Sequence, residues 1–200
     1  MKEMRVILPS IERPKKLPVV LGHNEVRQLL KAPKLLKHRL VLAMLYGCGL
    51  RSFELCNLQL KDLDLERKML HVRQGKGRKD RYVPLCAMQV RGLRKYISAE
   101  RPVTWCFNGN DSKGDPVALS TTGVQWIVRE ARKHSGIQKE VTTHSLRHSY
   151  ATHLLEMGLD IISVKDLLGH ADIQTTLTYL HVAQLGRQRP FSPLERLYNK

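Results

Sequence analysis

The segment from residue 143 to residue 179 constrains the fold more than any other part of the sequence. Near its start, apolar residues recur at steps of four, four and three positions, which places their side chains on one face of a core-facing helix. Gly158 is placed to end this helix in the left-handed conformation, and Gly169 to end a second, shorter one. A third helical run is expected from about 175 to 185, with Tyr179 in its first turns. The apolar positions of the first helix are Leu146, Tyr150, Leu154 and Met157.

Four side chains that can bind a phosphate group lie near the expected helix ends. His144 and Arg147 are three residues apart, so they lie one turn apart on the same side of their helix. Because Gly169 ends the second helix, His170 emerges at a helix terminus, and Tyr179 follows in the third run. Two imidazoles, a guanidinium and a phenol are together suited to binding a phosphate group.

These residues belong to three motifs in a fixed order. They are His-x-x-Arg-His at 144–148, Leu-Leu-Gly-His at 167–170 and Thr-Thr-x-x-Tyr at 175–179. Their order, spacing and flanks resemble the catalytic domain of the tyrosine recombinase (phage integrase) family, especially its Xer-type and transposon-borne members. The resemblance implies a mainly α fold with a small antiparallel β-sheet (α+β), the tyrosine recombinase catalytic-domain fold, over residues 21–185.

Two further stretches match the same family. Gly-Leu-Arg-x-x-Glu-Leu at 49–55 resembles its first arginine motif; without the resemblance, Arg51 would be interpreted as a surface charge near a helix cap. Phe53 stands where the family usually has a small residue. Gly-Lys-Gly-x-Lys-Asp-Arg at 75–81, followed by Val-Pro-Leu, resembles the family's β-hairpin, which makes Lys76 a catalytic candidate; otherwise it would be interpreted as a solvated turn.

The resemblance also implies roles in cleaving a DNA phosphodiester. Arg51 and Arg147 clamp the non-bridging oxygens, and Tyr179 is the nucleophile. His144 accepts the tyrosine proton and Lys76 protonates the 5′-oxygen leaving group. His170 hydrogen-bonds the phosphate or orients the tyrosine. The product is a covalent 3′-phosphotyrosyl link, formed without cofactor, metal or ATP.

Charge favours a nucleic-acid partner. The chain of 200 residues carries 34 Lys and Arg against 18 Asp and Glu, a net charge of +16, and an excess this large favours a polyanion, with nucleic acid ahead of a membrane. Candidate DNA contacts lie in three basic stretches, although solvated faces explain them about as well. The candidates are Lys15, Lys16, Arg78, Lys79, Arg81, Arg129, Arg132 and Lys133.

The remaining sequence features concern the location of the protein, its cysteines and metal binding. No run is long and apolar enough for a membrane span, and the first ten residues lack a signal-peptide pattern, so a cytoplasmic, nucleoid-associated bacterial protein is expected. The scattered Cys48, Cys56, Cys86 and Cys106 are expected to be buried free thiols. His144 and His148 have a spacing that could mimic a metal pair, but no acidic partner supports zinc, and the resemblance makes His148 a structural residue.

Secondary structure outside the central segment is expected as follows. Helices are predicted at about 22–31, 37–46, 53–58, 90–97 and 120–133, strands near 63–65, 70–73 and 82–85, and a loop at 108–116. Residues 1–20 are expected to be a linker from a missing N-terminal DNA-clamp domain, and 186–200 a tail that docks on a neighbouring subunit. The resemblance implies double-stranded DNA with a specific recombination site as partner, and a tetramer on two duplexes.

Three alternatives remain open at this level. The chain could be a DNA-binding module without catalysis, such as a regulatory relative or a fragment; the presence of all six candidate residues argues against lost chemistry, whereas the expected lack of a clamp domain argues for weak activity of the chain alone. It could be a type IB topoisomerase, which shares the mechanism without exchanging DNA partners. A metal-dependent nuclease is the third, and cleavage that persists in EDTA would exclude it.

Overall fold

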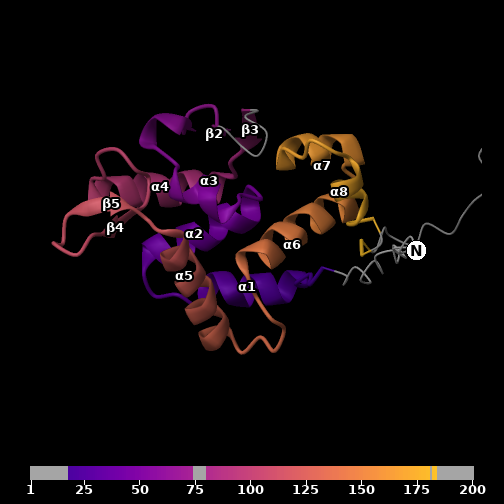
Figure 1. The fold of residues 1–200 in the computed structure, drawn as a ribbon, viewed down its shortest axis with the longest axis horizontal. Helices are drawn as coiled ribbons and strands as arrows, with labels where there is room; N and C mark the ends of the chain where they lie inside the picture. The colour runs from indigo at the N-terminus through magenta and orange to yellow at the C-terminus, as the bar shows by residue number, and fades with distance from the viewer. Residues whose placement is uncertain (1–17, 74–79, 181, 184–200) are drawn as a thin grey trace, which may run out of the picture.

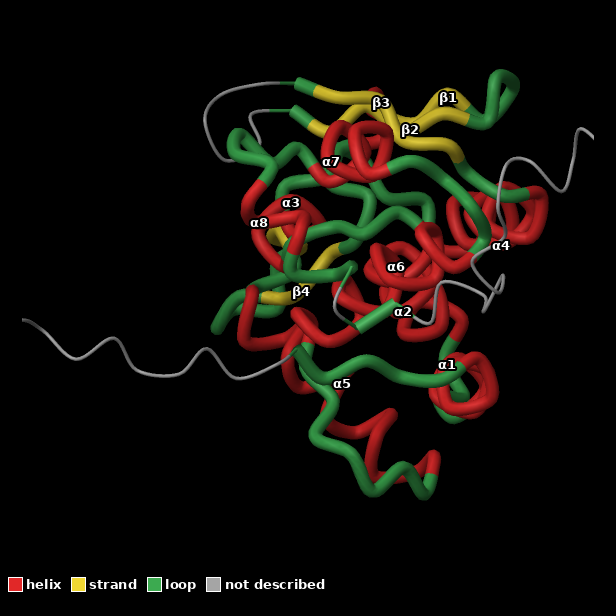
Figure 2. Tube along the Cα trace, turned by 90° about the vertical axis from the view of Figure 1, so that its right-hand side faces the viewer, coloured by secondary structure: helices red, strands yellow, loops and turns green. Residues whose placement is uncertain are grey.

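The computed structural model describes residues 18–73, 80–180 and 182–183. It is mainly α-helical with two small antiparallel sheets, which confirms the predicted α+β class (Figures 1 and 2). None of the helices among these residues is both long enough and apolar enough to cross a bilayer. The helices are α1 (His23–Lys31), α2 (Leu36–Gly47), α3 (Ser52–Cys56), α4 (Ala87–Glu100), α5 (Thr121–Ser135), α6 (Thr143–Glu156), α7 (Ile161–Leu168), α8 (Gln174–Leu177) and the 3-10 turn η1 (Leu60–Asp62).

Helix α2 forms the centre of the core. It packs against α1, α3, α4, α5 and α6, and apolar residues face inward on most of its sides, as expected for a helix surrounded by others. In Figure 1, α6 crosses the middle of the molecule between α1 and α7. The fully buried residues of α2 are Val41, Leu42, Met44 and Leu45.

The larger sheet has the order β1 (Leu63–Asp64), β2 (Met69–Val72), β3 (Arg81–Pro84). All pairs are antiparallel, and β2 and β3 pair His71 with Tyr82 and Val72 with Arg81. Figure 2 shows this sheet at one end of the molecule with α7 beside it, and α7 contacts β3. Residue 76 therefore belongs to the connection between two paired strands, although it lies outside the described residues.

The predicted loop at 108–116 is instead a β-hairpin. Strands β4 (Asn108–Asn110) and β5 (Pro116–Ala118) pair antiparallel. The Asp111 carboxylate closes the turn by accepting hydrogen bonds from the backbone N–H groups of Lys113 and Asp115, each at 2.8 Å. Asn, Gly and Asp have turn chemistry, so the residue pattern was right for the turn and missed only the short pairing on either side.

The end of the described chain differs from the expected third helix. Helix α8 ends at Leu177, and Tyr179 lies in the turn that follows, where its N–H bonds the carbonyl of Thr176 at 3.0 Å. β-Branched threonines at 175, 176 and 178 disfavour a longer helix. Tyr179 packs with α6 and α7 in a small apolar cluster of Tyr150, Ala151, Leu155, Val164, Leu168 and Tyr179.

Local capping follows the sequence closely. Asp160 accepts hydrogen bonds from the N–H groups of Ile162 and Ser163, both at 2.9 Å, and Gly169 ends α7 with φ of 63°. Met157, predicted to face the core, is 70% exposed because α6 ends one residue earlier.

Candidate active site

Three arginines from three segments meet at the buried carboxylate of Glu54. Arg81, at the start of β3, donates from Nη1 and Nη2 to the two carboxylate oxygens at 2.9 and 2.8 Å. Arg51, the N-cap residue of α3, donates from Nη1 at 2.8 Å. Arg147 of α6 lies 3.8 Å away. Burial would raise the pKa of Glu54, but Arg81 foremost, with Arg51 and Arg147, lowers it to about 2.

Arg147 joins the two halves of the site. Its Nη1 donates to the carbonyl of Gly49 and its Nη2 to that of Leu168, both at 2.6 Å, so α6 is tied to the loop before Arg51 and to the end of α7. Burial and the charge of Arg51 lower the pKa of Arg147 to about 10, which leaves it charged at neutral pH. A guanidinium has more N–H donors than these two carbonyls use, so it retains capacity for a phosphate.

Arg51 and His144 share a wide cleft. The cleft has a volume of about 710 Å³, and its other wall is formed by α5, including Arg129 and Arg132. Arg129 is exposed, and Arg132 is partly held by the carbonyl of Gln138 at 3.1 Å. The structure thus brings two of the predicted DNA-contacting residues beside two predicted catalytic ones. Lys133, on the same helix, is exposed, but it is not among the described residues that line this cleft.

Tyr179 lies inside the protein, with 3% of its surface exposed. Its hydroxyl is 3.0 Å from Nδ1 of His148, and the two ring centroids are 5.5 Å apart. Burial raises the pKa of Tyr179, and the charges of Arg147 and Arg51 partly oppose this rise. The hydroxyl is therefore protonated at neutral pH and close to the arginine cluster.

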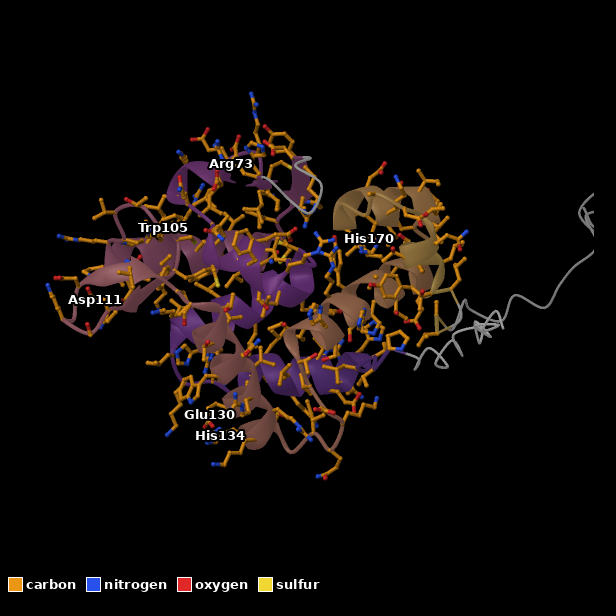
Figure 3. All side chains as sticks on the ribbon, viewed as in Figure 1. Arg73, Trp105, Asp111, Glu130, His134 and His170 are labelled. Atoms are coloured by element: carbon orange, nitrogen blue, oxygen red, sulfur yellow. The ribbon has the colours of Figure 1, made fainter. Side chains whose placement is uncertain are left out.

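His170 occupies the junction of α7 and α8 (Figure 3). Its ring centroid lies 6.3 Å from that of Tyr179, and its Nδ1 is 2.9 Å from the Thr176 hydroxyl. Burial first, and then the charges of Arg147, Arg51 and Arg81, lower the pKa of His170 to about 4. His170 is consequently a neutral imidazole next to the tyrosine.

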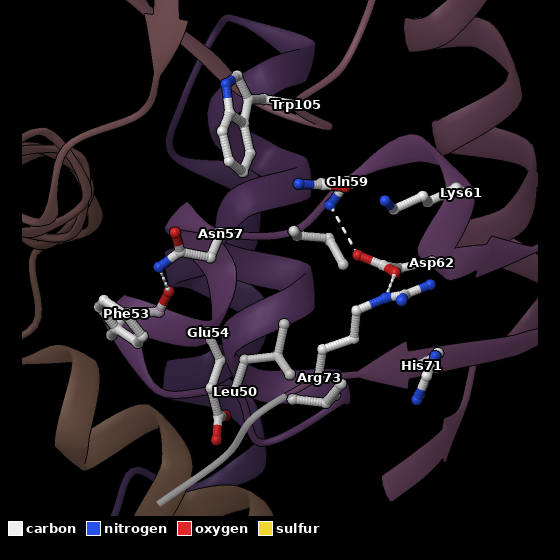
Figure 4. Close-up of a pocket in the computed structure, with 12 residues that line it drawn as sticks. Leu50, Phe53, Glu54, Asn57, Gln59, Lys61, Asp62, His71, Arg73 and Trp105 are labelled. Atoms are coloured by element: carbon white, nitrogen blue, oxygen red, sulfur yellow. Dashed lines mark hydrogen bonds and ion pairs between the residues drawn. The ribbon is translucent and has the colours of Figure 1, made fainter. Parts of the chain in front are cut away.

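Side-chain contacts hold the ends of β2 and β3 from which the segment with Lys76 leaves and to which it returns. His71 Nε2 lies 2.9 Å from the Asp80 carboxylate. Arg73 donates to Asp62, whose other oxygen accepts the backbone N–H of Gln59 at 3.0 Å, and Figure 4 shows these contacts in a pocket of about 270 Å³. Lys76 and the predicted DNA contacts Lys15, Lys16, Arg78 and Lys79 lie outside the described residues.

The position of Arg81 does not support the prediction that it touches DNA. Only 8% of its surface is exposed, and besides the Glu54 contacts its Nε donates to the carbonyl of Leu167 at 2.8 Å. Arg81 instead joins β3, α3 and α7 around the arginine cluster.

His148 contacts Tyr179 although the sequence does not predict this contact. The resemblance makes His148 a structural residue and gives the role of accepting the tyrosine proton to His144. In the structure His144 is exposed at the cleft, and its ring centroid is 6.4 Å from that of His148, which makes the contact with Tyr179. The signal in the sequence was the spacing of four residues, which puts both imidazoles on one helix face.

A possible metal cluster lies apart from this site. His23, His153 and Glu156 offer ligand atoms that all lie within 4.8 Å of one another. The two imidazole rings stack with centroids 4.0 Å apart and an angle of 14° between their planes. Lone pairs in parallel ring planes do not converge on one ion, and His153 Nδ1 is already 2.9 Å from the Tyr46 hydroxyl.

The fold is that of a tyrosine recombinase catalytic domain. Residues 19–185 match the Phage integrase family. The putative integrase/recombinase y4qK of Sinorhizobium fredii (strain NBRC 101917 / NGR234) is 40% identical over 191 residues, which are 96% of this chain and 61% of that protein. Tyrosine recombinase XerA of Thermococcus onnurineus (strain NA1) is 40% identical over 171 residues, 84% of this chain and 60% of the relative. This chain belongs to the phage integrase family.

Solved structures agree with the sequence comparison. The crystal structure of XerA recombinase superimposes with a TM-score of 0.79 at 32% identity, covering 92% of this chain and 68% of XerA. XerH site-specific recombinase bound to palindromic difH substrate, in a post-cleavage complex, gives 0.72 at 27% identity and covers 91% of this chain and 53% of XerH. The chain thus spans only part of the length of these relatives.

Proposed function

We propose that this chain is the catalytic domain of a site-specific DNA recombinase or integrase that breaks and rejoins DNA through a covalent 3′-phosphotyrosyl intermediate, without metal or ATP. The observation that carries the proposal is the convergence of Arg51 and Arg147 on Glu54, with the charges of both arginines acting on Tyr179. A phenol is a weak nucleophile, so it needs a positive field and a proton acceptor nearby.

The proposed division of labour begins with the arginines. Glu54 offsets part of their charge and holds Arg51 at the cleft, where it and Arg147 would neutralise the non-bridging oxygens of the scissile phosphate. Tyr179 would attack phosphorus, an imidazole would take its proton, and Lys76 would protonate the departing 5′-oxygen. His170, neutral and next to Tyr179, would hydrogen-bond the phosphate or orient the ring.

Double-stranded DNA with a specific recombination site is the proposed partner. The net charge of +16 and the position of Arg129 and Arg132 on the cleft support it. XerH, at 27% identity, is described as bound to its difH substrate. We expect Arg129, Arg132 and Lys133 to contact phosphates, and also Lys15, Lys16, Arg78 and Lys79.

Assembly is part of the same proposal. We infer that the chain acts as a tetramer on two duplexes in a bacterial cytoplasm, with residues 1–20 joining it to a DNA-clamp domain and residues 186–200 docking on a neighbouring subunit. A largely apolar groove of about 650 Å³ between α2, α4 and α6 offers a surface for such contacts. Mass photometry with and without DNA would test this assembly.

Covalent trapping tests the reaction. A duplex that the wild-type chain selects from a randomised pool is nicked near the cleaved bond, so that the short product diffuses away and the adduct accumulates. We expect a denaturation-resistant protein–DNA adduct, with and without EDTA, and none with Tyr179→Phe, which should still bind the duplex. An adduct in that variant, or one that requires a divalent metal, would contradict the mechanism.

One observation favours a second candidate, a DNA-binding module that does not cut alone. Tyr179 is only 3% exposed and must reach a phosphate to react. If the wild-type chain binds the duplex and forms no adduct at any protein concentration, this second function is the better description.

A further inference from the structure

We infer that His148 is a catalytic residue: its Nδ1 accepts the proton of the Tyr179 hydroxyl as that oxygen bonds to phosphorus. The inference rests on the proposed function and assigns to His148 a role that the sequence pattern alone gave to His144. Its basis is the 3.0 Å contact between Nδ1 and the hydroxyl oxygen. A general base must lie within hydrogen-bond reach of the proton that it removes, and this distance satisfies that requirement before any DNA binds.

The neighbouring imidazoles are placed for other tasks. His144 is exposed on the cleft beside Arg51, and in the described part of the chain it makes no hydrogen bond with Tyr179. His170 stands beside the tyrosine ring, but its Nδ1 is engaged with Thr176 at 2.9 Å. His148 is the imidazole that contacts the reacting oxygen.

The protonation states fit a donor and an acceptor. Burial, and then the charges of His144 and Arg147, lower the pKa of His148, so its imidazole is neutral at neutral pH. Burial raises the pKa of Tyr179, so the phenol keeps its proton. A neutral imidazole that accepts at Nδ1 carries its hydrogen on Nε2, and the hydroxyl then donates to Nδ1.

The Tyr179 oxygen forms a bond to phosphorus while the bond from phosphorus to the 5′-oxygen breaks. The phenol proton moves to His148 Nδ1 and yields an imidazolium, while the 5′-oxygen takes a proton from the general acid, proposed to be Lys76. Rejoining runs in reverse, and His148 returns its proton to the departing phenolate. The adjacent Arg147 makes the imidazolium unfavourable in the free protein, and the negative phosphate offsets that cost once DNA is bound.

Substitutions at 148 separate proton transfer from positioning. His148→Asn places an amide near Nδ1 that can still hydrogen-bond the hydroxyl but cannot take its proton. His148→Ala removes both functions. His38→Asn is the matched control, because His38 is another half-buried imidazole whose pKa burial lowers, and it contacts Trp126 instead of the site.

Single-turnover adduct formation on the nicked duplex is the measurement. Both His148 variants should slow it by about 100-fold or more, the scale of general acid–base catalysis, with DNA affinity and thermal unfolding close to wild type. Imidazole in the buffer should recover part of the His148→Ala rate. Difluorotyrosine has a more acidic phenol, which needs less help from a base. With difluorotyrosine at position 179, the difference in rate between wild type and the His148 variants should therefore be about tenfold smaller. His38→Asn should react like wild type.

Several results would overturn the assignment. His148→Asn reacting within about threefold of wild type would show a hydrogen bond without proton transfer. A loss in both variants that neither imidazole nor difluorotyrosine recovers would indicate a structural role. Absence of an adduct from the wild-type chain would instead contradict the proposed function, and the His148 role would fall with it. NMR of the imidazole nitrogens gives a test that needs no DNA: His148 should carry its hydrogen on Nε2, and Tyr179→Phe should shift its Nδ1 resonance. A hydrogen on Nδ1 would contradict the inference.

Discussion

Arg81 holds Glu54 by both carboxylate oxygens, with Nη1 2.9 Å from Oε1 and Nη2 2.8 Å from Oε2. The same carboxylate accepts a hydrogen bond from Arg51 at 2.8 Å and faces Arg147 at 3.8 Å. One buried anion therefore sets the positions of two residues proposed to bind the scissile phosphate. Glu54 comes from α3, which follows Arg51, whereas Arg81 comes from β3, so the ion pair links α3 to the larger sheet.

Glu54→Gln should destabilise the fold by about 3 kcal/mol, because it leaves three guanidinium groups near a neutral amide. Urea unfolding at neutral pH measures this loss. Glu66→Gln is the control, since Glu66 is exposed on the same half of the chain, and it should leave the free energy of unfolding nearly unchanged. Equal stability of the two variants would mean that the cluster does not depend on the Glu54 charge.

The ionisation of Glu54 should also appear in the pH dependence of the free energy of unfolding. Burial opposes ionisation of Glu54 but the arginines prevail, so its pKa in the folded chain is about 2, below the value of about 4.3 in an unfolded chain. The stabilisation is therefore complete at neutral pH and is lost as the pH falls from about 4 towards 2. The wild-type chain should lose about 2 kcal/mol across this range in excess of Glu54→Gln, by urea unfolding at each pH, and about 3 kcal/mol in all once the pH lies below both pKa values. Parallel curves for the two proteins would contradict the low pKa.

Much of the local structure was readable from the sequence because it depends on neighbours in the chain. Gly169 takes a left-handed conformation at the end of α7, and Asp160 caps the start of that helix. The apolar period of 3.6 also identified the long helices. The motif around Arg51 was recognisable for a similar reason, since its residues are contiguous.

The parts that escaped prediction depend on contacts between distant segments. Arg81 resembled a DNA-binding arginine at a hairpin, and only the packing of β3 against α3 and α7 gave its guanidinium internal partners. Likewise, Tyr179 and His148 are 31 residues apart, and nothing in their local sequence says which of the three imidazoles on α6 meets the hydroxyl. Pair contacts of this kind are properties of the folded chain.

Replacing both Arg129 and Arg132 with Ala should weaken DNA binding and make it less sensitive to salt. If each contacts one phosphate, the slope of log affinity against log salt should fall by about 1.8 in magnitude, or about 0.9 per contact. Fluorescence anisotropy with a labelled non-specific duplex over a salt series measures the slope. Arg91 and Arg94, exposed on α4, provide a control pair with the same change in charge. If the control pair lowers the slope as much, general charge and not the cleft binds the phosphates.

Gly49→Ala should cost several kcal/mol of stability. Gly49 has φ of 58°, where a side chain costs roughly 1–2 kcal/mol. A Cβ there would also lie 2.4 Å from the ring of Tyr150, which adds the strain of an overpacked core. Gly114→Ala is the matched control, because Gly114 has φ of 89° with nothing within 4 Å of its Cβ position. Gly114→Ala should lose only the roughly 1–2 kcal/mol that a side chain costs in the left-handed conformation. Equal losses by urea unfolding would show that the approach to Tyr150 is relieved without cost.

Thiol reactivity should distinguish Cys86 from the other cysteines, which corrects the expectation that all four are buried. Cys86 is exposed at the start of α4, whereas Cys48, Cys56 and Cys106 are buried free thiols. Burial raises the pKa of Cys48 and Cys106 to about 12 and that of Cys56 to about 11, so few thiolates form and the alkylating reagent cannot reach them. Mass spectrometry after brief treatment with N-ethylmaleimide should find one adduct on the native chain, none on Cys86→Ser, and four on the wild type in denaturant. Rapid labelling of Cys48 in the native chain would mean that the core around α2 opens readily.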